Sequence, residues 1–190
     1  MDILDDAINF AVQAHSGIVR KASGMPYILH PLEVTAIAGT MTYDREVLAA
    51  AVLHDTVEDA GISIDEIRER FGERVAFLVA AETEDKMREM SPSESWRMRK
   101  ESSLRMLEEE NDVYAMIICL GDKLSNMRSF DRGIRERGEK FWEAFNQKDP
   151  EQHFWYYSTV ARILSKLRDY PAYEEYVALT EKVFGRRIEL

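Results

Sequence analysis

A histidine and three carboxylates lie within six residues of one another in the first third of the chain. The apolar run Ala49–Leu53 leads directly into His54, Asp55, Glu58 and Asp59. On one continuous helix of about 3.6 residues per turn, these four side chains would share one side. Carboxylates placed so close together repel one another, and a divalent cation would turn that repulsion into attraction. The cluster therefore predicts a metal site, because imidazole and carboxylate are common ligands, and a solvated acidic helix face is the alternative.

Two further segments carry polar side chains of the same kinds. His30 precedes Pro31, which suits the first turn of a helix and would fix the chain beside the histidine. A packed or capping histidine is the alternative there. Asp122 follows an apolar run and is expected to be buried, where a carboxylate needs a cation, hydrogen-bond donors or a metal. We expect Lys123 to point away from Asp122 on a helix and Asn126 to share its face, and a structural aspartate paired with a distant arginine is the alternative.

Composition restricts the classes of partner. The 190 residues carry a net charge of -10, which argues against nonspecific binding to nucleic acid or to an anionic membrane surface. No run approaches the roughly 20 apolar residues of a membrane span. The single cysteine, Cys119, cannot form an internal disulfide, and the acidic start lacks the basic region of a signal peptide. We therefore expect one domain over residues 1–190 in the cytoplasm.

The elements that must position these residues read as helices. The one strand-like run, Val113–Leu120, has no second alternating run to pair with and is predicted to be a buried helix. Helix start signals recur along the chain: Asp44, Ser63 with Glu66, Ser91 with Glu94, and Asp149 with Pro150. Breaks are expected near residues 17–26, 61–63, 72, 86–93, 133–138 and 147–150. An all-α fold follows.

Taken in order, the motifs resemble those of one family. His30-Pro31, His54-Asp55 with Glu58-Asp59, and Asp122 with Asn126 and Arg128 resemble the HD-domain hydrolases of the RelA/SpoT type, above all their small stand-alone alarmone hydrolases. Also similar are Arg20-Lys21 with Gly24, Pro26-Tyr27, Phe71-Gly72, Glu84-Asp85-Lys86 and Trp155-Tyr156-Tyr157. The resemblance implies an all-α HD-domain helical bundle of about 8–10 helices, with the motif-bearing core over about 3–168 and a C-terminal helix over about 171–187.

The resemblance also implies an activity and its residues. The reaction would remove the 3′-pyrophosphate from guanosine 3′,5′-bis(diphosphate), ppGpp or pppGpp, giving GDP or GTP and pyrophosphate. His30, His54, Asp55 and Asp122 would hold one manganese ion. The ligand types also permit other divalent metals. Glu58 and Asp59 would orient and deprotonate the attacking water, and Asn126 would contact the reaction centre.

A small-molecule nucleotide this anionic needs basic contacts. Arg20 and Lys21 match the basic pair that the family places near the nucleotide, and two solvated loop cations are the alternative. A second basic cluster, Lys86, Arg97, Arg99 and Lys100 around Trp96, is expected to contribute Lys86 and Lys100. Helical pairing with Glu94, Glu101 and Glu108 is the alternative there. Tyr156 would line the pocket. The chain departs from the family pattern at Ser125, where a histidine is common, at Gly121, where an alanine is common, and in a longer loop over residues 21–26.

Other functions remain open at this point. Besides His30 and His54 the chain has only His15 and His153, so a two-metal cage rich in histidines is disfavoured, and His15 is assigned to the end of the first helix. The alternatives are hydrolysis of ppApp, of the 2′-phosphate of NADPH or of a nucleoside monophosphate, a non-catalytic nucleotide-sensing module, and a helical interaction protein. The aromatic-rich segment 141–157 fits core or an interface between copies in a homo-oligomer, and we favour core for most of it.

Overall fold

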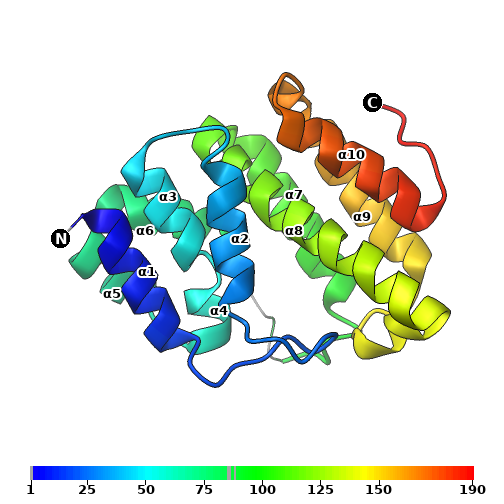
Figure 1. The fold of residues 1–190 in the computed structure, drawn as a ribbon, viewed down its shortest axis with the longest axis horizontal. Helices are drawn as coiled ribbons and strands as arrows, with labels where there is room; N and C mark the ends of the chain where they lie inside the picture. Colours follow the sequence, from blue (N-terminus) through cyan, green and yellow to red (C-terminus); the bar gives the residue numbers. More distant parts are fainter. Residues whose placement is uncertain (1, 85–86, 88) are drawn as a thin grey trace.

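The computed structural model describes residues 2–84, 87 and 89–190, and this part of the chain is a bundle of helices (Figure 1). The described residues form ten α-helices and two short 3-10 helices, which confirms the all-α prediction. In chain order the elements are α1 (Ile3–Ala14), α2 (Leu29–Ala38), α3 (Arg45–Leu53), α4 (Thr56–Ala60), α5 (Ile64–Phe71), α6 (Glu73–Glu82), α7 (Trp96–Glu110), α8 (Val113–Arg137), η1 (Gly138–Ala144), α9 (Pro150–Ile163), η2 (Leu164–Leu167) and α10 (Pro171–Phe184). None of the helices in this part of the chain is long and apolar enough to cross a membrane.

Side-chain caps begin most of the helices that the sequence predicts. The Asp44 carboxylate accepts the Glu46 N–H at 3.1 Å, and Asp149 starts α9 in the same way, with Pro150 as its first residue. Ser63 accepts the N–H of Glu66 and starts α5. Ser91 also accepts the N–H of Glu94, but α7 begins only at Trp96, so this predicted box closes a turn ahead of the helix. The run 113–120 is helical, as expected, and begins α8.

The break predicted over residues 133–138 is only half right. The 25-residue helix α8 passes through Gly133 without interruption and ends at Arg137, because Gly138 adopts a positive φ of 58°. Gly133 does not end the helix but allows close packing. A Cβ atom built on it would lie 2.2 Å from Cε2 of Phe141, whose ring is buried against this point of the helix.

We expect Gly133→Ala to destabilise the protein by a net amount of up to about 2 kcal/mol, because overpacking against Phe141 costs about 1–3 kcal/mol and the gain in helix propensity returns only about 1 kcal/mol. Denaturant unfolding followed by circular dichroism measures this change. The Phe141→Leu background is the control, since removal of the ring should reduce the cost of the added methyl group. An equal cost in both backgrounds would contradict the assignment of the clash to this ring.

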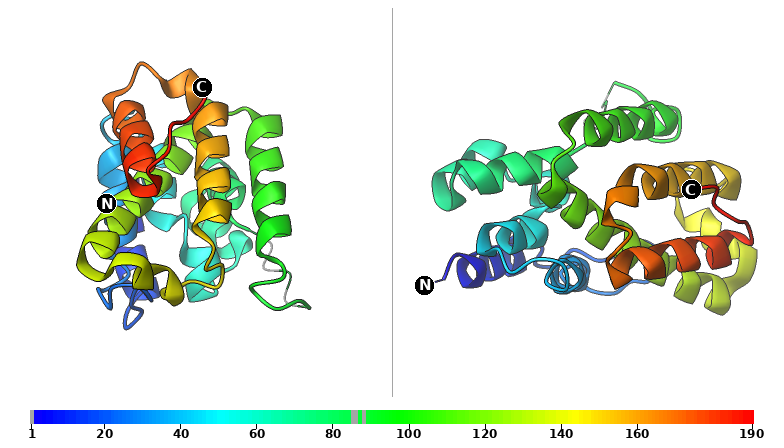
Figure 2. Two further views of the ribbon diagram at one scale, coloured as in Figure 1. Left: turned by 90° about the vertical axis from the view of Figure 1, so that its right-hand side faces the viewer. Right: turned by 90° about the horizontal axis from the view of Figure 1, so that it is seen from above.

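The longest helix, α8, is the central element of the bundle. The helices α2, α3 and α6 pack on its N-terminal part, while α10 lies along it and α9 packs against α10 (Figures 1 and 2). The last five residues of α3, Ala49–Leu53, are fully buried, and their three small alanine side chains allow neighbouring helices to approach. This arrangement brings the end of α3, the start of α2 and the middle of α8 to one place.

The aromatic-rich segment is mostly core, as favoured from the sequence. Phe141, Trp142, Tyr156 and Tyr157 are buried, and the ring of Phe130 on α8 meets Phe141, Trp142 and Tyr157 edge to face. Trp155 and Phe154 are half-buried. The expected C-terminal helix is α10, which ends at Phe184, three residues before the predicted end. The homo-oligomer and the single-domain boundaries stay predictions.

Candidate metal centre

The cluster at residues 54–59 is divided by a turn. Helix α3 ends at Leu53 and α4 begins at Thr56, so His54 and Asp55 lie between two helices, and the expectation of one continuous helix is wrong. Two side chains form hydrogen bonds with carbonyl groups in the last turn of α3. His54 Nδ1 lies 2.8 Å from the Ala51 oxygen, and the Thr56 hydroxyl donates to the Leu53 oxygen at 2.6 Å. The helix ends here because these carbonyls are satisfied without continuing backbone N–H groups.

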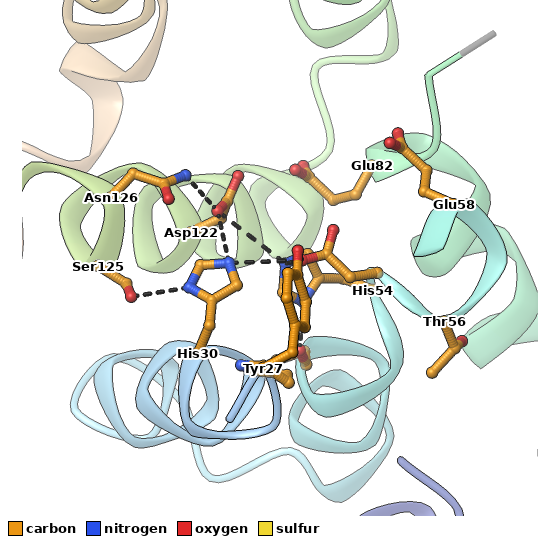
Figure 3. A network of polar contacts seen from close by, with 12 residues as sticks. Tyr27, His30, His54, Thr56, Glu58, Glu82, Asp122, Ser125 and Asn126 are labelled. Atoms are coloured by element: carbon orange, nitrogen blue, oxygen red, sulfur yellow. Dashed lines mark hydrogen bonds and ion pairs between the residues drawn. The ribbon is translucent and has the colours of Figure 1, made fainter. Parts of the chain in front are cut away.

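Four side chains predicted as metal ligands meet in the interior, carried by α2, the α3–α4 turn and α8. His30 Nε2 lies 3.1 Å from Asp122 Oδ1 and 3.4 Å from Asp55 Oδ2. His54 Nε2 lies 3.2 Å from the same Asp55 oxygen and 4.0 Å from Asp122 Oδ1 (Figure 3). One donor atom each from His30, His54 and Asp122 fall within 4.8 Å of one another, and all three residues are buried.

The orientation of His54 leaves one nitrogen for a cation. A carbonyl oxygen only accepts, so the contact with Ala51 places the proton of the neutral ring on Nδ1 and the lone pair on Nε2. The Nε2 atom is buried and, within the described part of the chain, has no partner in hydrogen-bond geometry. A buried unsatisfied nitrogen facing two carboxylates is costly in an apolar interior, and a divalent ion would satisfy it. The residues present therefore fit a metal ion.

Burial and neighbouring charges together determine the pKa values of the groups in the centre. Burial opposes protonation of His54, but the Asp55 carboxylate outweighs it and raises the pKa of the imidazole to about 9. Burial lowers the pKa of His30 and the positive charge of Arg20 adds to the effect, although the Asp122 and Asp55 carboxylates oppose it. Burial also opposes ionisation of Asp55, yet His54 holds the pKa of that carboxyl well below its usual range. The carboxylates thus remain charged inside the protein, and the field that favours a proton on His54 also attracts a cation.

Lys123 contradicts the sequence expectation. Its flexible side chain does not point away from Asp122, because Nζ contacts Asp122 Oδ2 and lies 4.0 Å from Glu82 Oε2. Burial disfavours ionisation of Asp122, but the Lys123 ammonium outweighs it and holds the pKa of the carboxyl well below its ordinary value. Asp122 therefore already has a cationic partner. The metal assignment depends on the convergence of four ligands and on the unsatisfied His54 nitrogen.

Sequence reasoning missed Glu82, the last residue of α6. Its carboxylate is almost fully covered, with a side chain 6% exposed, and burial raises its pKa to about 7. Figure 3 shows Glu82 on the side of the centre that also holds Glu58. The signal was available in the sequence, because Glu82 follows the apolar run 78–81 in the way that Asp122 follows its own run.

The acidic pair follows the turn on α4. Glu58 is half-buried, and its Oε1 atom accepts the backbone N–H of Glu84 at 2.6 Å. Burial raises the pKa of the Glu58 carboxyl above its ordinary value. Asp59 is exposed and lines a cavity beside the centre. Glu58 and Asp59 thus follow the proposed ligands by one helical turn, with Glu58 fixed by the backbone of Glu84 and Asp59 at the cavity, and their roles stay predictions.

The cavity beside the centre has a volume of about 340 Å³, and its polar lining comes from residues far apart in the sequence. It contains Arg20, Lys21, Tyr27, Asp59 and Asn126. The Arg20 guanidinium donates to Asn126 Oδ1 at 2.9 Å, and Asn126 Nδ2 donates to Asp122 Oδ1 at 2.7 Å. These contacts connect the cavity wall to the metal centre.

Tyr27, which the sequence analysis noted only as part of the Pro26-Tyr27 motif, makes contacts that the sequence did not predict. Its hydroxyl donates to Asp55 Oδ2 at 2.7 Å, while its ring lies 5.5 Å from the Arg20 guanidinium. The Tyr27 ring centroid also lies 5.0 Å from that of His15. His15 caps the end of α1, as expected, and does not belong to the candidate ligand group among the described residues. Tyr27 therefore joins the cavity wall to a proposed ligand.

Two more of the predicted substrate residues, Lys100 and Tyr156, lie away from this cavity. Lys100 pairs with Glu84 and sits 4.8 Å from the ring centroid of Tyr156. Tyr156 lines a second cavity of about 200 Å³, together with Glu82 and Lys123. Lys86 lies outside the described residues. Arg97 pairs with Glu101 one turn on, as the helical-pairing alternative expects, and Arg99 pairs with Glu84.

Comparisons with known proteins agree with this architecture. A family model described as an HD domain matches residues 7–149. A GTP pyrophosphokinase of Myxococcus xanthus is 33% identical over 139 residues, which cover 72% of this chain and 18% of that protein. The guanosine-3′,5′-bis(diphosphate) 3′-pyrophosphohydrolase of Aquifex aeolicus is 36% identical over 123 residues, covering 65% and 17%. The chain thus spans less than a fifth of the length of these curated relatives.

Two solved structures match over more of their length. A metazoan ortholog of SpoT, described as hydrolysing ppGpp, superposes with a TM-score of 0.75 at 25% sequence identity, covering 96% of this chain and 95% of that one. A protein of Listeria monocytogenes EGD-e gives a TM-score of 0.71 at 28% identity, covering 83% and 99%. The overall helical arrangement is therefore shared with these two proteins.

Proposed function

Because this chain belongs to the HD domain family, we propose that it is a metal-dependent hydrolase that removes the 3′-pyrophosphate from guanosine 3′,5′-bis(diphosphate). The observation that carries the proposal is the buried, unsatisfied His54 Nε2 facing two carboxylates, beside an acidic pair and a basic cavity. The activities named for the Aquifex protein and the SpoT ortholog support the choice of substrate.

We assign the ion to His30, His54, Asp55 and Asp122. Two imidazoles and two carboxylates with room for further oxygen ligands suit a six-coordinate ion, so we propose one Mn²⁺. When bound, such an ion polarises phosphate oxygens and makes water more acidic. The buried position of the ligands excludes competing solvent from one side and keeps their charges strong.

Proton transfer is assigned to the acidic pair. Glu58 would accept the proton of the attacking water on its carboxylate, which the Glu84 N–H holds in place. A base works best when its pKa approaches the working pH, and burial moves Glu58 in that direction. Asp59, at the rim of the cavity, would accept a second hydrogen bond from the same water and orient it. Asn126, between Arg20 and Asp122, would position the reacting phosphate.

Substrate binding is assigned to the 340 Å³ cavity. Arg20 offers a planar fork for phosphate oxygens and Lys21 an exposed point charge. In a chain of net charge -10 these cations provide the local positive field that a polyanionic nucleotide requires. The ring of Tyr27 supplies an aromatic face in the same wall. Tyr156 would contact the substrate from the second cavity, which Lys123 also lines, and Lys100 would act beside the Tyr156 ring. We place the reaction in the cytoplasm.

Pyrophosphate release tests the proposal. We expect the purified protein with Mn²⁺ to release pyrophosphate from guanosine 3′,5′-bis(diphosphate), to stop when a chelator removes the ion, and to recover when Mn²⁺ is returned. The adenosine analogue, NADPH and nucleoside monophosphates are assayed in parallel. Release from one of these alone would move the assignment to another phosphoester. Nucleotide binding without any product would indicate a sensing module, and absence of a bound ion would overturn the metal site.

A further inference from the structure

A continuous chain of polar contacts runs from His30 on α2 to the C-terminal helix α10. His30 Nδ1 lies 2.8 Å from the Ser125 hydroxyl oxygen (Figure 3). That hydroxyl donates to Glu33 Oε2 at 2.7 Å. The other oxygen of Glu33 accepts from the Arg128 guanidinium at 3.1 Å. Arg128 in turn donates to both carboxylate oxygens of Glu175, at 2.7 and 2.8 Å.

The direction of each hydrogen bond in this chain is determined. A carboxylate only accepts, so the single hydroxyl hydrogen of Ser125 goes to Glu33. Ser125 can then only accept from His30, and the ring proton of His30 must sit on Nδ1. The lone pair is left on Nε2, the atom that lies 3.1 Å from Asp122 Oδ1 in the metal centre. Arg128 has no acceptor and keeps Glu33 in the accepting role.

We propose that Glu33 and Ser125 are positioning residues that hold His30 in its metal-binding tautomer, and that Arg128 and Glu175 hold Glu33 in place. This inference rests on the proposed metal site. The two histidines of the centre are oriented in different ways. The tautomer of His54 is fixed by the backbone carbonyl of Ala51, whereas that of His30 depends on a relay of side chains, formed by Ser125, Glu33, Arg128 and Glu175. The tautomer of His30 is therefore sensitive to substitution and that of His54 is not.

The relay extends the centre beyond the part of the chain that the family model covers. That match ends at residue 149, whereas Glu175 lies on α10, which packs along α8 (Figure 2). Ser125 is 2% exposed, so water cannot replace its hydrogen bonds.

Glu33→Gln tests the relay by reversing it. Because Arg128 only donates, the new amide would turn its oxygen to Arg128 and its NH₂ group to Ser125. The Ser125 hydroxyl would then donate to His30 Nδ1 and drive the ring proton to Nε2, the wrong tautomer for a ligand. We expect Mn²⁺ to bind about 10–100-fold more weakly in this variant.

Two measurements are needed, and the first uses metal-free protein. Two-bond nitrogen–proton correlations report the tautomer of each ring, and the chain has only four histidines, with His30 assigned from the spectrum of His30→Asn. Titration calorimetry with Mn²⁺ alone gives the affinity. Asp6→Asn is the matched control, because Asp6 also pairs with an arginine, Arg70, but lies far from the relay on the exposed surface. This control should leave both readouts at wild-type values.

The outcomes are distinct. A proton on Nε2 of His30 in the wild type, or an unchanged tautomer and affinity in Glu33→Gln, would overturn the relay. If Glu33→Gln does not fold, Ser125→Ala is measured instead; it removes the acceptor and should leave His30 as a mixture of tautomers with weaker Mn²⁺ binding. If the wild type binds no Mn²⁺ or hydrolyses no nucleotide, the proposed function fails while the tautomer on metal-free protein still decides the relay.

Discussion

Asp55→Asn should lose both the divalent ion and pyrophosphate release. The amide is isosteric with the carboxylate and its oxygen can still accept the Tyr27 hydroxyl, so the turn between α3 and α4 is expected to keep its shape. What disappears is the negative charge 3.2 Å from His54 Nε2 and 3.4 Å from His30 Nε2. We expect the rate to fall by on the order of 10³ or more, which corresponds to about 4 kcal/mol of transition-state stabilisation.

The measurements are metal content after purification, Mn²⁺ titration and release of pyrophosphate. Asp65→Asn on α5 is the matched control, because it makes the same chemical change on an exposed side chain remote from the centre. It should bind the ion and react as the wild type does. Retention of a stoichiometric ion and of full activity by Asp55→Asn would remove Asp55 from the ligand set and with it the proposed centre.

Glu58→Gln should separate proton transfer from metal binding. Its amide oxygen can still accept the N–H of Glu84, so the side chain is expected to stay in place while losing its basicity. We expect kcat to fall by about 10²–10⁴, the usual contribution of a positioned general base, with metal content unchanged and KM nearly so. Steady-state kinetics of pyrophosphate release, combined with metal analysis on the same sample, gives all three quantities.

Glu69→Gln, on the exposed face of α5, controls for the loss of one negative charge. An unchanged kcat in Glu58→Gln would contradict its assignment as base and direct attention to Asp59. Loss of the ion from Glu58→Gln would instead indicate that Glu58 supports the ligands and does not act on water. Together with Asp55→Asn, this variant distinguishes a defect in the ion from a defect in the proton acceptor.

Local sequence was enough to predict the class of fold and to single out several of the polar residues that meet in the centre. The caps at Asp44, Ser63 and Asp149 act within their own first turn, so their signal needs no tertiary contact. The same holds for a buried carboxylate or histidine, because an apolar run that ends in a charged group already implies burial of that group. His54 and Asp122 were found in this way, and Glu82 carried the same signal.

Errors arose where the answer depended on a neighbour distant in the sequence. The break at Gly133 was expected because glycine often ends helices, but the glycine is required by the ring of Phe141. Lys123 was expected to point away from Asp122 because helix geometry alone places adjacent residues apart, whereas a long side chain bends toward two buried carboxylates. Neither outcome is encoded in periodicity.

The sequence by itself determined which chemical groups this protein has available: two imidazoles, two carboxylates that we propose as ligands, an acidic pair and a basic loop on a helical chain. Only the tertiary structure decided how they are used. It placed the turn at His54 and Asp55, joined Tyr27 to Asp55, and set Glu33 behind Ser125 so that His30 presents Nε2. The physical reason is the distance along the chain over which each interaction acts. Caps and amphipathic faces depend on neighbours in the sequence, whereas hydrogen-bond direction and burial depend on the packing of α2, α8 and α10 against one another.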